Sequence, residues 1–307
     1  MNTESRLIKL YRTRTFSEKM SDTFDFVREN WRPLIKYITY LLLPVALIET
    51  FLGDNFMTGN IRFANIIGKN DITEMMPWLS SLIGMVLFTY VGFILLNALV
   101  YTMMQQYEQR QGLQDVTFAD LKPGILRMTA RQMILFAISI VLIVVFFIFF
   151  ALMITISPFM IFPVILVAIL VYPLLILVTP IYLFEDRGII STYAKSVRLG
   201  WKTWAGIVAV TIVLYTIAII LQTVISMPAY IMMGIKEVLT AKGDGAGFVS
   251  SFGYSAVQYL LGVIASFCGS CLLSFVTIGT AYQYGHACDK VDGVTVDRDI
   301  ENFESLN

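Results

Sequence analysis

Charged residues are scarce in this chain: Asp, Glu, Lys and Arg make up 14% of its 307 residues, whereas 57% are hydrophobic. An average soluble domain has roughly 25% charged residues, so this composition excludes an ordinary water-soluble globule. Neither sign of charge predominates, because 22 basic residues balance 22 acidic ones. We therefore expect no nucleic-acid partner, since nucleic-acid-binding domains usually carry a basic excess.

Residues suited to metal and redox chemistry are also few. The chain has one histidine, His286, and three cysteines, of which Cys268 and Cys271 have C-x-x-C spacing. No second cysteine pair is present to relay electrons or to complete a zinc site, so we expect no metal and no cofactor. Small residues recur at every fourth position in the same stretch, and the cysteines are alternatively small packing residues against another helix. The small residues are Gly262, Ser266, Ser270 and Ser274.

Long apolar runs, in contrast, are abundant. Six of them approach or exceed the length of about 20 residues that a helix needs to cross a bilayer. They are residues 34–52, 79–104, 133–156, 160–183, 205–233 and 252–284. These 155 residues contain only two charged side chains, Lys36 and Glu49. Because a helix satisfies its own backbone groups in lipid, the runs predict an all-α, polytopic membrane protein with six transmembrane helices.

The basic residues are distributed unevenly among the connections between these runs. Eighteen lie in the N-terminal arm with its helix junction at Lys36, in the second and fourth connections and in the tail, whereas four lie in the remaining connections. The positive-inside tendency then assigns both termini to the cytoplasm. We expect three parts: a cytoplasmic arm with an amphipathic helix (1–33), a six-helix transmembrane domain (34–288) and a solvated acidic cytoplasmic tail (289–307).

Each cytoplasmic connection shows the apolar spacing of an amphipathic helix that leads into a span. Capping-box patterns at residues 15–18 and 117–120 predict the first two starts, and Pro123 with the following glycine predicts an interruption in the second helix. The expected apolar faces are Phe16, Met20, Phe24, Val27 and Trp31; then Leu121, Ile125 and Met128; then Ile189, Tyr193, Val197, Trp201 and Trp204.

The order of these segments predicts a threefold parallel repeat of one amphipathic helix plus one transmembrane hairpin. Phe16, Phe118 and Ile189 hold equivalent places at the start of the three copies. All copies enter from the same side, which distinguishes the arrangement from an inverted repeat.

Two interpretations of the amphipathic helices remain open. Their apolar faces either pack on the cytoplasmic ends of the spans or lie in the headgroup layer of the membrane. In the second case Lys195, Arg198 and Lys202, together with Trp201, are the expected contacts to lipid phosphates or to a partner, at about 1 kcal/mol for each basic residue.

Polar side chains inside the spans are the other candidate site residues. Glu49 is the only acid within a span, and it lies either near enough to the outer end to reach water or at a proton or cation site. Asn97 and Gln222 are expected to hydrogen-bond between helices. Prolines 163, 173 and 180 predict kinks in the fourth span, which either gate a cavity or only shape the bundle.

Residues 179–186 (TPIYLFED), residues 194–199 (AKSVRL) and Trp201 resemble a pattern in a broad group of bacterial membrane proteins. This group includes the membrane domain attached to some glycerophosphoryl diester phosphodiesterases and many six-span relatives. The resemblance covers about 25 residues plus the layout of the spans, and it implies a multi-pass location in the bacterial cytoplasmic (inner) membrane. The chain has no room for the phosphodiesterase barrel, so the resemblance transfers no catalytic residue.

The predicted spans contain almost no ionisable side chains, so we identify no acid, base and nucleophile that could act together in catalysis. We therefore expect a non-enzymatic membrane protein that organises or assists partners or lipids at the cytoplasmic face. Its expected partners are membrane lipids and other membrane proteins. The alternative is a small-solute or lipid transporter that uses the kinked fourth span.

Overall fold

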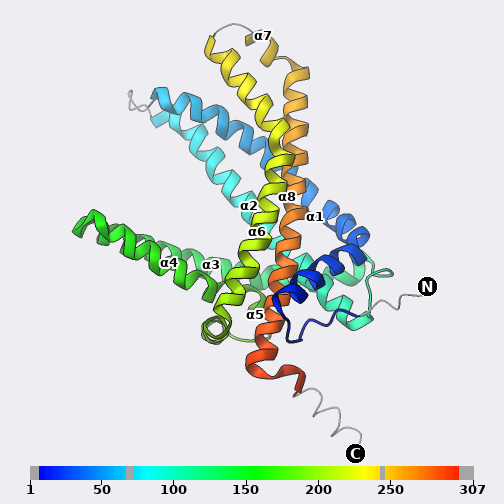
Figure 1. The fold of residues 1–307 in the computed structure, drawn as a ribbon. Coiled ribbons are helices and arrows are strands. Elements are labelled where there is room, and N and C mark those ends of the chain that lie inside the picture. The colour runs from blue at the N-terminus through cyan, green and yellow to red at the C-terminus, as the bar shows by residue number, and fades with distance from the viewer. Residues whose placement is uncertain (1–6, 67–71, 243–245, 297–307) are drawn as a thin grey trace, which may run out of the picture. The chain divides into compact units, whose positions relative to one another are not determined.

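The computed structural model describes residues 7–66, 72–242 and 246–296 of the chain, and within these ranges the secondary structure is helical. The long helices are α1 (Phe16–Ile66), α2 (Ile72–Arg110), α3 (Phe118–Ile156), α4 (Ile161–Leu175), α6 (Ile189–Lys242) and α8 (Phe252–Asp292). Three short helices complete the fold: η1 (Pro158–Met160), α5 (Val178–Phe184) and α7 (Ala246–Val249) (Figure 1).

The predicted fold class is confirmed. Among the described residues, six helical segments are long and apolar enough to cross a membrane, which is consistent with a multi-pass membrane protein. The segment from Phe118 to Thr155 has the highest mean hydropathy, 3.3, and only 6% of its most apolar window is buried. Such a helix needs a lipid or protein environment around it, because its exposed side chains would otherwise contact water.

The chain divides into two compact units, each made of separate sequence segments. Unit 1 comprises residues 1–33, 98–215 and 275–307, and unit 2 comprises residues 34–97 and 216–274. The long helices α1, α2, α6 and α8 each contribute one part to each unit. The division into parts 1–33, 34–288 and 289–307 stays a prediction.

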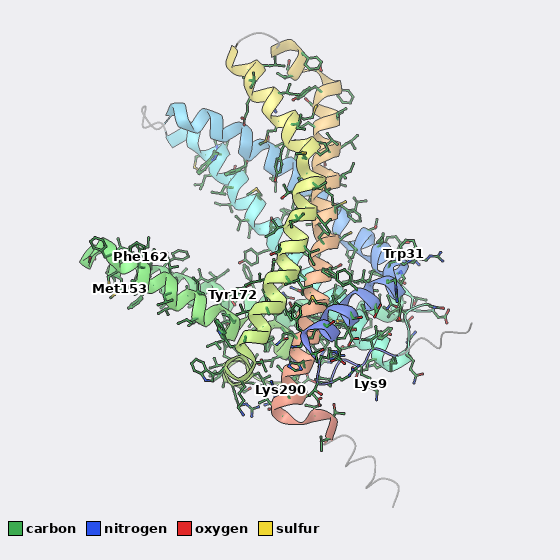
Figure 2. All side chains as sticks on the ribbon, viewed as in Figure 1. Lys9, Trp31, Met153, Phe162, Tyr172 and Lys290 are labelled. Atoms are coloured by element: carbon green, nitrogen blue, oxygen red, sulfur yellow. The ribbon has the colours of Figure 1, made fainter. Side chains whose placement is uncertain are left out.

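In unit 1, α3 and α4 form a tight hairpin (Figure 1). The one-turn helix η1 joins them, as expected from the short connection in the sequence. Met153 and Phe162 lie near each other at the closed end of this hairpin (Figure 2). The fourth apolar run breaks after Leu175, between Pro173 and Pro180, and continues as α5. The predicted kink is confirmed, since a proline removes a backbone donor and clashes with the preceding turn.

The amphipathic segments continue into their spans without an intervening loop. Inside α1 the backbone of Asn30 leaves helical geometry (φ −113°, ψ 17°), and inside α6 Thr203 does the same (φ −123°, ψ 19°). Each residue therefore marks a bend between an amphipathic segment and the span that follows it. These bends lie fourteen residues after Phe16 and Ile189, and this equal spacing supports the repeat, which stays a prediction.

The predicted interruption at Pro123 is wrong, because α3 runs without a break from Phe118 to Ile156. Pro123 lies in the second turn, so the missing donor affects a carbonyl of the first turn only. Gly124 instead serves close packing, since a Cβ built on it would lie 2.6 Å from Cγ2 of Thr102. The predicted capping box of Thr117 and Asp120 is present in both directions.

In unit 2 the small-residue stripe of α8 packs against α1, as predicted. A Cβ on Gly262 would lie 2.5 Å from Cγ2 of Thr50, so the two helices approach closely at this point. The hydroxyl of Ser266 donates a hydrogen bond of 2.7 Å to Oε2 of Glu49. Close approach of small residues is a common mode of helix packing in membranes.

Candidate functional site

The amphipathic segment of α1 presents its apolar side outward. Phe16, Phe24 and Trp31 are exposed, and Trp31 keeps 51% of its surface accessible. The buried side of the same segment carries mostly polar residues. The polar residues are Lys19, Thr23 and Asn30, and the apolar Phe26 lies among them. The outward face is incomplete, because Met20 and Val27 are half-buried and the Phe24 ring lies 4.8 Å from that of Phe275 in α8. Only Phe16 and Trp31 contradict the interpretation that the apolar face packs on the bundle.

Just before this segment, internal partners explain why the charged side chain of Arg14 is tolerated in a buried position. Nε of Arg14 lies 2.6 Å from Oδ2 of Asp22. The guanidinium of Arg14 also lies over the Tyr282 ring, 4.8 Å from its centroid. The backbone amide of Arg14 donates a hydrogen bond of 2.9 Å to Nδ1 of His286. Buried charge is tolerated when it is paired and hydrogen-bonded, and His286 is therefore part of this packing.

The amphipathic segment at the start of α6 likewise has apolar residues on its outer side and mostly polar residues on its inner side. Ile190 and Trp201 keep 87% and 76% of their surface accessible, and Val197 is exposed as well. The inner side buries Thr192, Lys195, Ser196, Leu199 and Thr203. Ser196 donates a hydrogen bond of 2.6 Å to the carbonyl oxygen of Leu174, which fixes this segment to α4. Exposed tryptophan and aliphatic side chains are typical of helices in the membrane interface.

The segment at the start of α3, in contrast, buries its predicted apolar face. Its predicted apolar residues, Leu121, Ile125 and Met128, are all buried. Thr102 donates a hydrogen bond of 3.4 Å to the sulfur of Met128 from the neighbouring helix α2. The structure therefore buries the predicted apolar face of the α3 segment and leaves apolar residues of the α1 and α6 segments exposed, whereas contact of these residues with the headgroup layer stays a prediction.

A network of ion pairs ties α6 to α8 and to the segment after α5. Nζ of Lys195 lies 2.7 Å from Oε1 of Glu185 and 3.2 Å from Oδ2 of Asp292. Arg198 also pairs with Asp292, at 2.7 Å. The hydroxyl of Tyr284 donates a further hydrogen bond of 2.7 Å to Glu185. Lys195 is only 8% exposed, so the expected contact between Lys195 and a lipid phosphate does not fit the structure.

The other residues that were predicted to contact lipid phosphates or a partner are accessible. Trp201 and Lys202 are exposed, and the side chain of Arg198 keeps 54% of its surface accessible while it pairs with Asp292. Asp292 belongs to α8 and Asp289 accepts a hydrogen bond of 2.9 Å from the amide of Thr295. These two acids are therefore not simply solvated, whereas residues 297–307 of the predicted tail lie outside the described residues.

The residues that carry the family resemblance also connect helices. Arg131 of α3 forms an ion pair of 2.9 Å with Asp186. The Arg131 side chain also donates hydrogen bonds to the carbonyl oxygens of Tyr182 (2.6 Å) and Glu185 (2.8 Å). Its guanidinium lies over the Tyr182 ring, 4.4 Å from the centroid. Arg127 pairs with Asp186 as well and holds the pKa of that carboxyl below its usual value. No pattern in the sequence indicates this contact, because the partners are more than 50 positions apart.

Unit 2 contains a cavity of about 440 Å³ between α1, α2 and α8. Glu49 lines this cavity, together with Ser266 and Ser270 from the small-residue stripe. Asn97 is buried but is not among the lining residues. Gln222 lies behind one wall and donates hydrogen bonds to Ser226 (2.9 Å) and to the carbonyl oxygen of Ala265 (3.1 Å), as expected for an interhelical amide.

Within residues 7–66, 72–242 and 246–296, no group of three His, Cys, Asp or Glu side chains is arranged to hold a metal ion. Cys268, Cys271 and Cys288 are free thiols. No protein family matches the chain, and no curated protein or solved structure shows significant similarity to it.

Proposed function

We propose that this multi-pass membrane protein binds anionic lipid through the outward-facing segments of α1 and α6 and thereby organises lipids or partner proteins at the cytoplasmic face. It acts without catalysis, in the bacterial cytoplasmic membrane, with both termini in the cytoplasm. The location draws on the resemblance to the six-span bacterial group described above. The orientation draws on the excess of basic residues in the arm, in two connections and in the tail.

The observation that carries this proposal is the exposure of Trp201 next to Lys202. The tryptophan ring keeps 76% of its surface accessible, and the adjacent lysine is exposed as well. An apolar ring that enters the headgroup layer places a neighbouring ammonium at the level of the lipid phosphates. Phe24 and Trp31 supply a second exposed aromatic surface on α1.

The alternative, a transporter that uses the kinked fourth span, receives less support. The break between α4 and α5 belongs to unit 1, whereas the cavity at Glu49 belongs to unit 2. A cavity of about 490 Å³ in unit 1 lies beside the kink, but mainly aliphatic and aromatic side chains line it, whereas the polar candidates Glu49, Asn97 and Gln222 belong to unit 2. The lipid-binding interpretation therefore explains more of the exposed surface.

The proposal is tested with the full chain reconstituted in phosphatidylcholine bilayers. Spin-labelled phosphatidylglycerol and spin-labelled phosphatidylcholine are added separately, and the motionally restricted fraction of each is measured. We expect the wild type to restrict phosphatidylglycerol preferentially and Lys202→Glu to lower this preference, because about 1 kcal/mol of attraction becomes repulsion. Lys122→Glu is the matched control, since Lys122 is exposed on the first segment of α3, whose predicted apolar residues Leu121, Ile125 and Met128 are buried. An unchanged preference in Lys202→Glu would contradict the proposal.

A further inference from the structure

The cavity of unit 2 has an acidic group in an otherwise apolar and hydroxyl-bearing surface. Glu49 enters from α1, Tyr90 and Phe93 from α2, and Ser266 and Ser270 from α8. Gly92 of α2 lies beside the carboxylate, since a Cβ built on it would be in van der Waals contact with Oε1 of Glu49, at 3.7 Å. The volume of about 440 Å³ is within the range of small-molecule sites in proteins.

The carboxylate of Glu49 has no cationic partner among the residues that the structure describes. Its hydrogen bond from Ser266, at 2.7 Å, engages Oε2 only. No Lys, Arg or His within the described ranges comes within ion-pair distance of either oxygen. An acidic side chain within a membrane span is normally paired, because an isolated ion is costly there.

The two serines present acceptors to the cavity. Ser266 gives its hydroxyl proton to Glu49, and Ser270 gives its proton to the carbonyl oxygen of Ser266 at 3.4 Å. Each hydroxyl oxygen therefore keeps lone pairs that can accept another hydrogen bond. A ligand group that suits this site carries positive charge and several N–H donors.

We propose that this cavity binds a primary ammonium group. The Glu49 carboxylate pairs with the charge, the oxygens of Ser266 and Ser270 accept N–H hydrogen bonds, and the aromatic side chains of Tyr90 and Phe93 attract the cation and cover its apolar body. Two sources offer this chemistry: a free lipophilic amine, or the headgroup of phosphatidylethanolamine. The proposal is independent of lipid binding by α6, because it concerns different residues in a different unit.

Binding is measured by calorimetry with the full chain in dodecylmaltoside micelles, which are uncharged and contain no amine. Hexylammonium is the probe and 1-hexanol is its uncharged counterpart. We expect hexylammonium to bind and hexanol to bind at least tenfold more weakly, because the alcohol cannot pair with the carboxylate. Equal affinity for the two probes would overturn the proposal.

Three variants separate recognition from folding. Glu49→Gln keeps the shape of the side chain and is expected to weaken hexylammonium binding at least tenfold. Glu237→Gln removes the same charge from an exposed position of unit 2 and should leave the affinity unchanged. Ser270→Leu keeps the carboxylate but fills the cavity, so it should also abolish binding. Wild-type affinity in either Glu49→Gln or Ser270→Leu, or an equal loss in Glu237→Gln, refutes the ammonium site.

Added lipids then distinguish the two sources. If phosphatidylethanolamine displaces hexylammonium and phosphatidylcholine does not, the site takes a lipid headgroup, since the quaternary nitrogen of phosphatidylcholine has no N–H donor. If neither lipid competes, the site takes a free amine. Equal displacement by both lipids would show that acyl chains occupy the cavity, and headgroup recognition would then be rejected.

Discussion

Asn30 and Thr203 are equivalent in the bends of two different helices. Each leaves helical geometry in the same direction, and each side chain donates a hydrogen bond to the carbonyl oxygen four residues earlier, at 2.9 Å to Phe26 and 2.8 Å to Leu199. A tryptophan follows directly in both cases. The bond holds a carbonyl near the bend, where the regular hydrogen-bond ladder is perturbed.

Replacing Asn30 with alanine is expected to destabilise the protein by about 1 kcal/mol, because a buried carbonyl oxygen loses its side-chain donor. The control is Asn55→Ala, which removes the same type of bond (3.1 Å to the carbonyl oxygen of Phe51) from an exposed position of α1. Thermal unfolding followed by circular dichroism gives the comparison. Equal shifts in the two variants would contradict a special role for the bend.

Lys195→Met is expected to destabilise the chain by about 3 kcal/mol or more, because Glu185 and Asp292 would lose the buried cation between them. Lys202→Met removes an exposed lysine with no ion pair among the described residues and should change stability by less than about 0.5 kcal/mol. Adding Glu185→Gln to Lys195→Met should recover part of the loss. A Lys195→Met variant as stable as wild type would show that the network is not stabilising.

The ion pair of Asp186 with Arg127 and Arg131 predicts a pH dependence. The pKa of Asp186 is lower in the folded chain than in the unfolded one, so its stabilising effect is complete above the unfolded value of about 4 and is lost as pH falls through the folded value. Wild type should therefore melt above Asp186→Asn at pH 7, and the difference should shrink toward pH 2. Asp115→Asn, an exposed carboxylate, serves as control. A gap between wild type and Asp186→Asn that is independent of pH would exclude this mechanism.

Gly200 is expected to tolerate no side chain. A Cβ there would lie 2.8 Å from Cα of Leu174, which is backbone and cannot rotate away. Gly200→Ala should cost about 1–3 kcal/mol through overpacking. Gly234→Ala, where no atom lies within 4 Å of the new Cβ, should be neutral or slightly stabilising because alanine favours the helix. Similar melting temperatures for the two variants would contradict the close contact between α4 and α6.

Cysteine labelling in intact cells tests the orientation. Ser250→Cys, exposed between α7 and α8, should react with a membrane-impermeant maleimide from outside. Asp115→Cys, exposed before α3, should react only after permeabilisation. The reverse pattern would place both termini outside the cytoplasm.

The sequence predicted the elements better than it predicted their surroundings. Apolar length identified the six helices, and local chemistry identified the capping box at Thr117 and the break between Pro173 and Pro180, because these features depend on neighbours in the chain. Burial was harder to predict. The polar side of an amphipathic helix usually faces water, yet Lys19 and Lys195 are buried because their surroundings come from distant segments of the chain.

The surroundings of the candidate site residues were likewise harder to predict from the sequence than the residues themselves. Glu49 was identified because an acid within an apolar run is conspicuous by itself. Its companions Ser266 and Ser270 were noted only as small packing residues, since nothing in the sequence shows that they lie opposite residue 49. Arg131 was not identified as a contact to the TPIYLFED segment, because its partners depend on the packing of α3 against α5.

The composition of the two units has a consequence for biosynthesis. Each unit combines early and late parts of the chain, and both require α8: residues 252–274 in unit 2 and residues from 275 onward in unit 1. Neither unit is complete when the first five apolar helices have left the ribosome. Among the long helices, α8 is therefore the last in chain order that both units need, and neither unit can close before α8 has been synthesised.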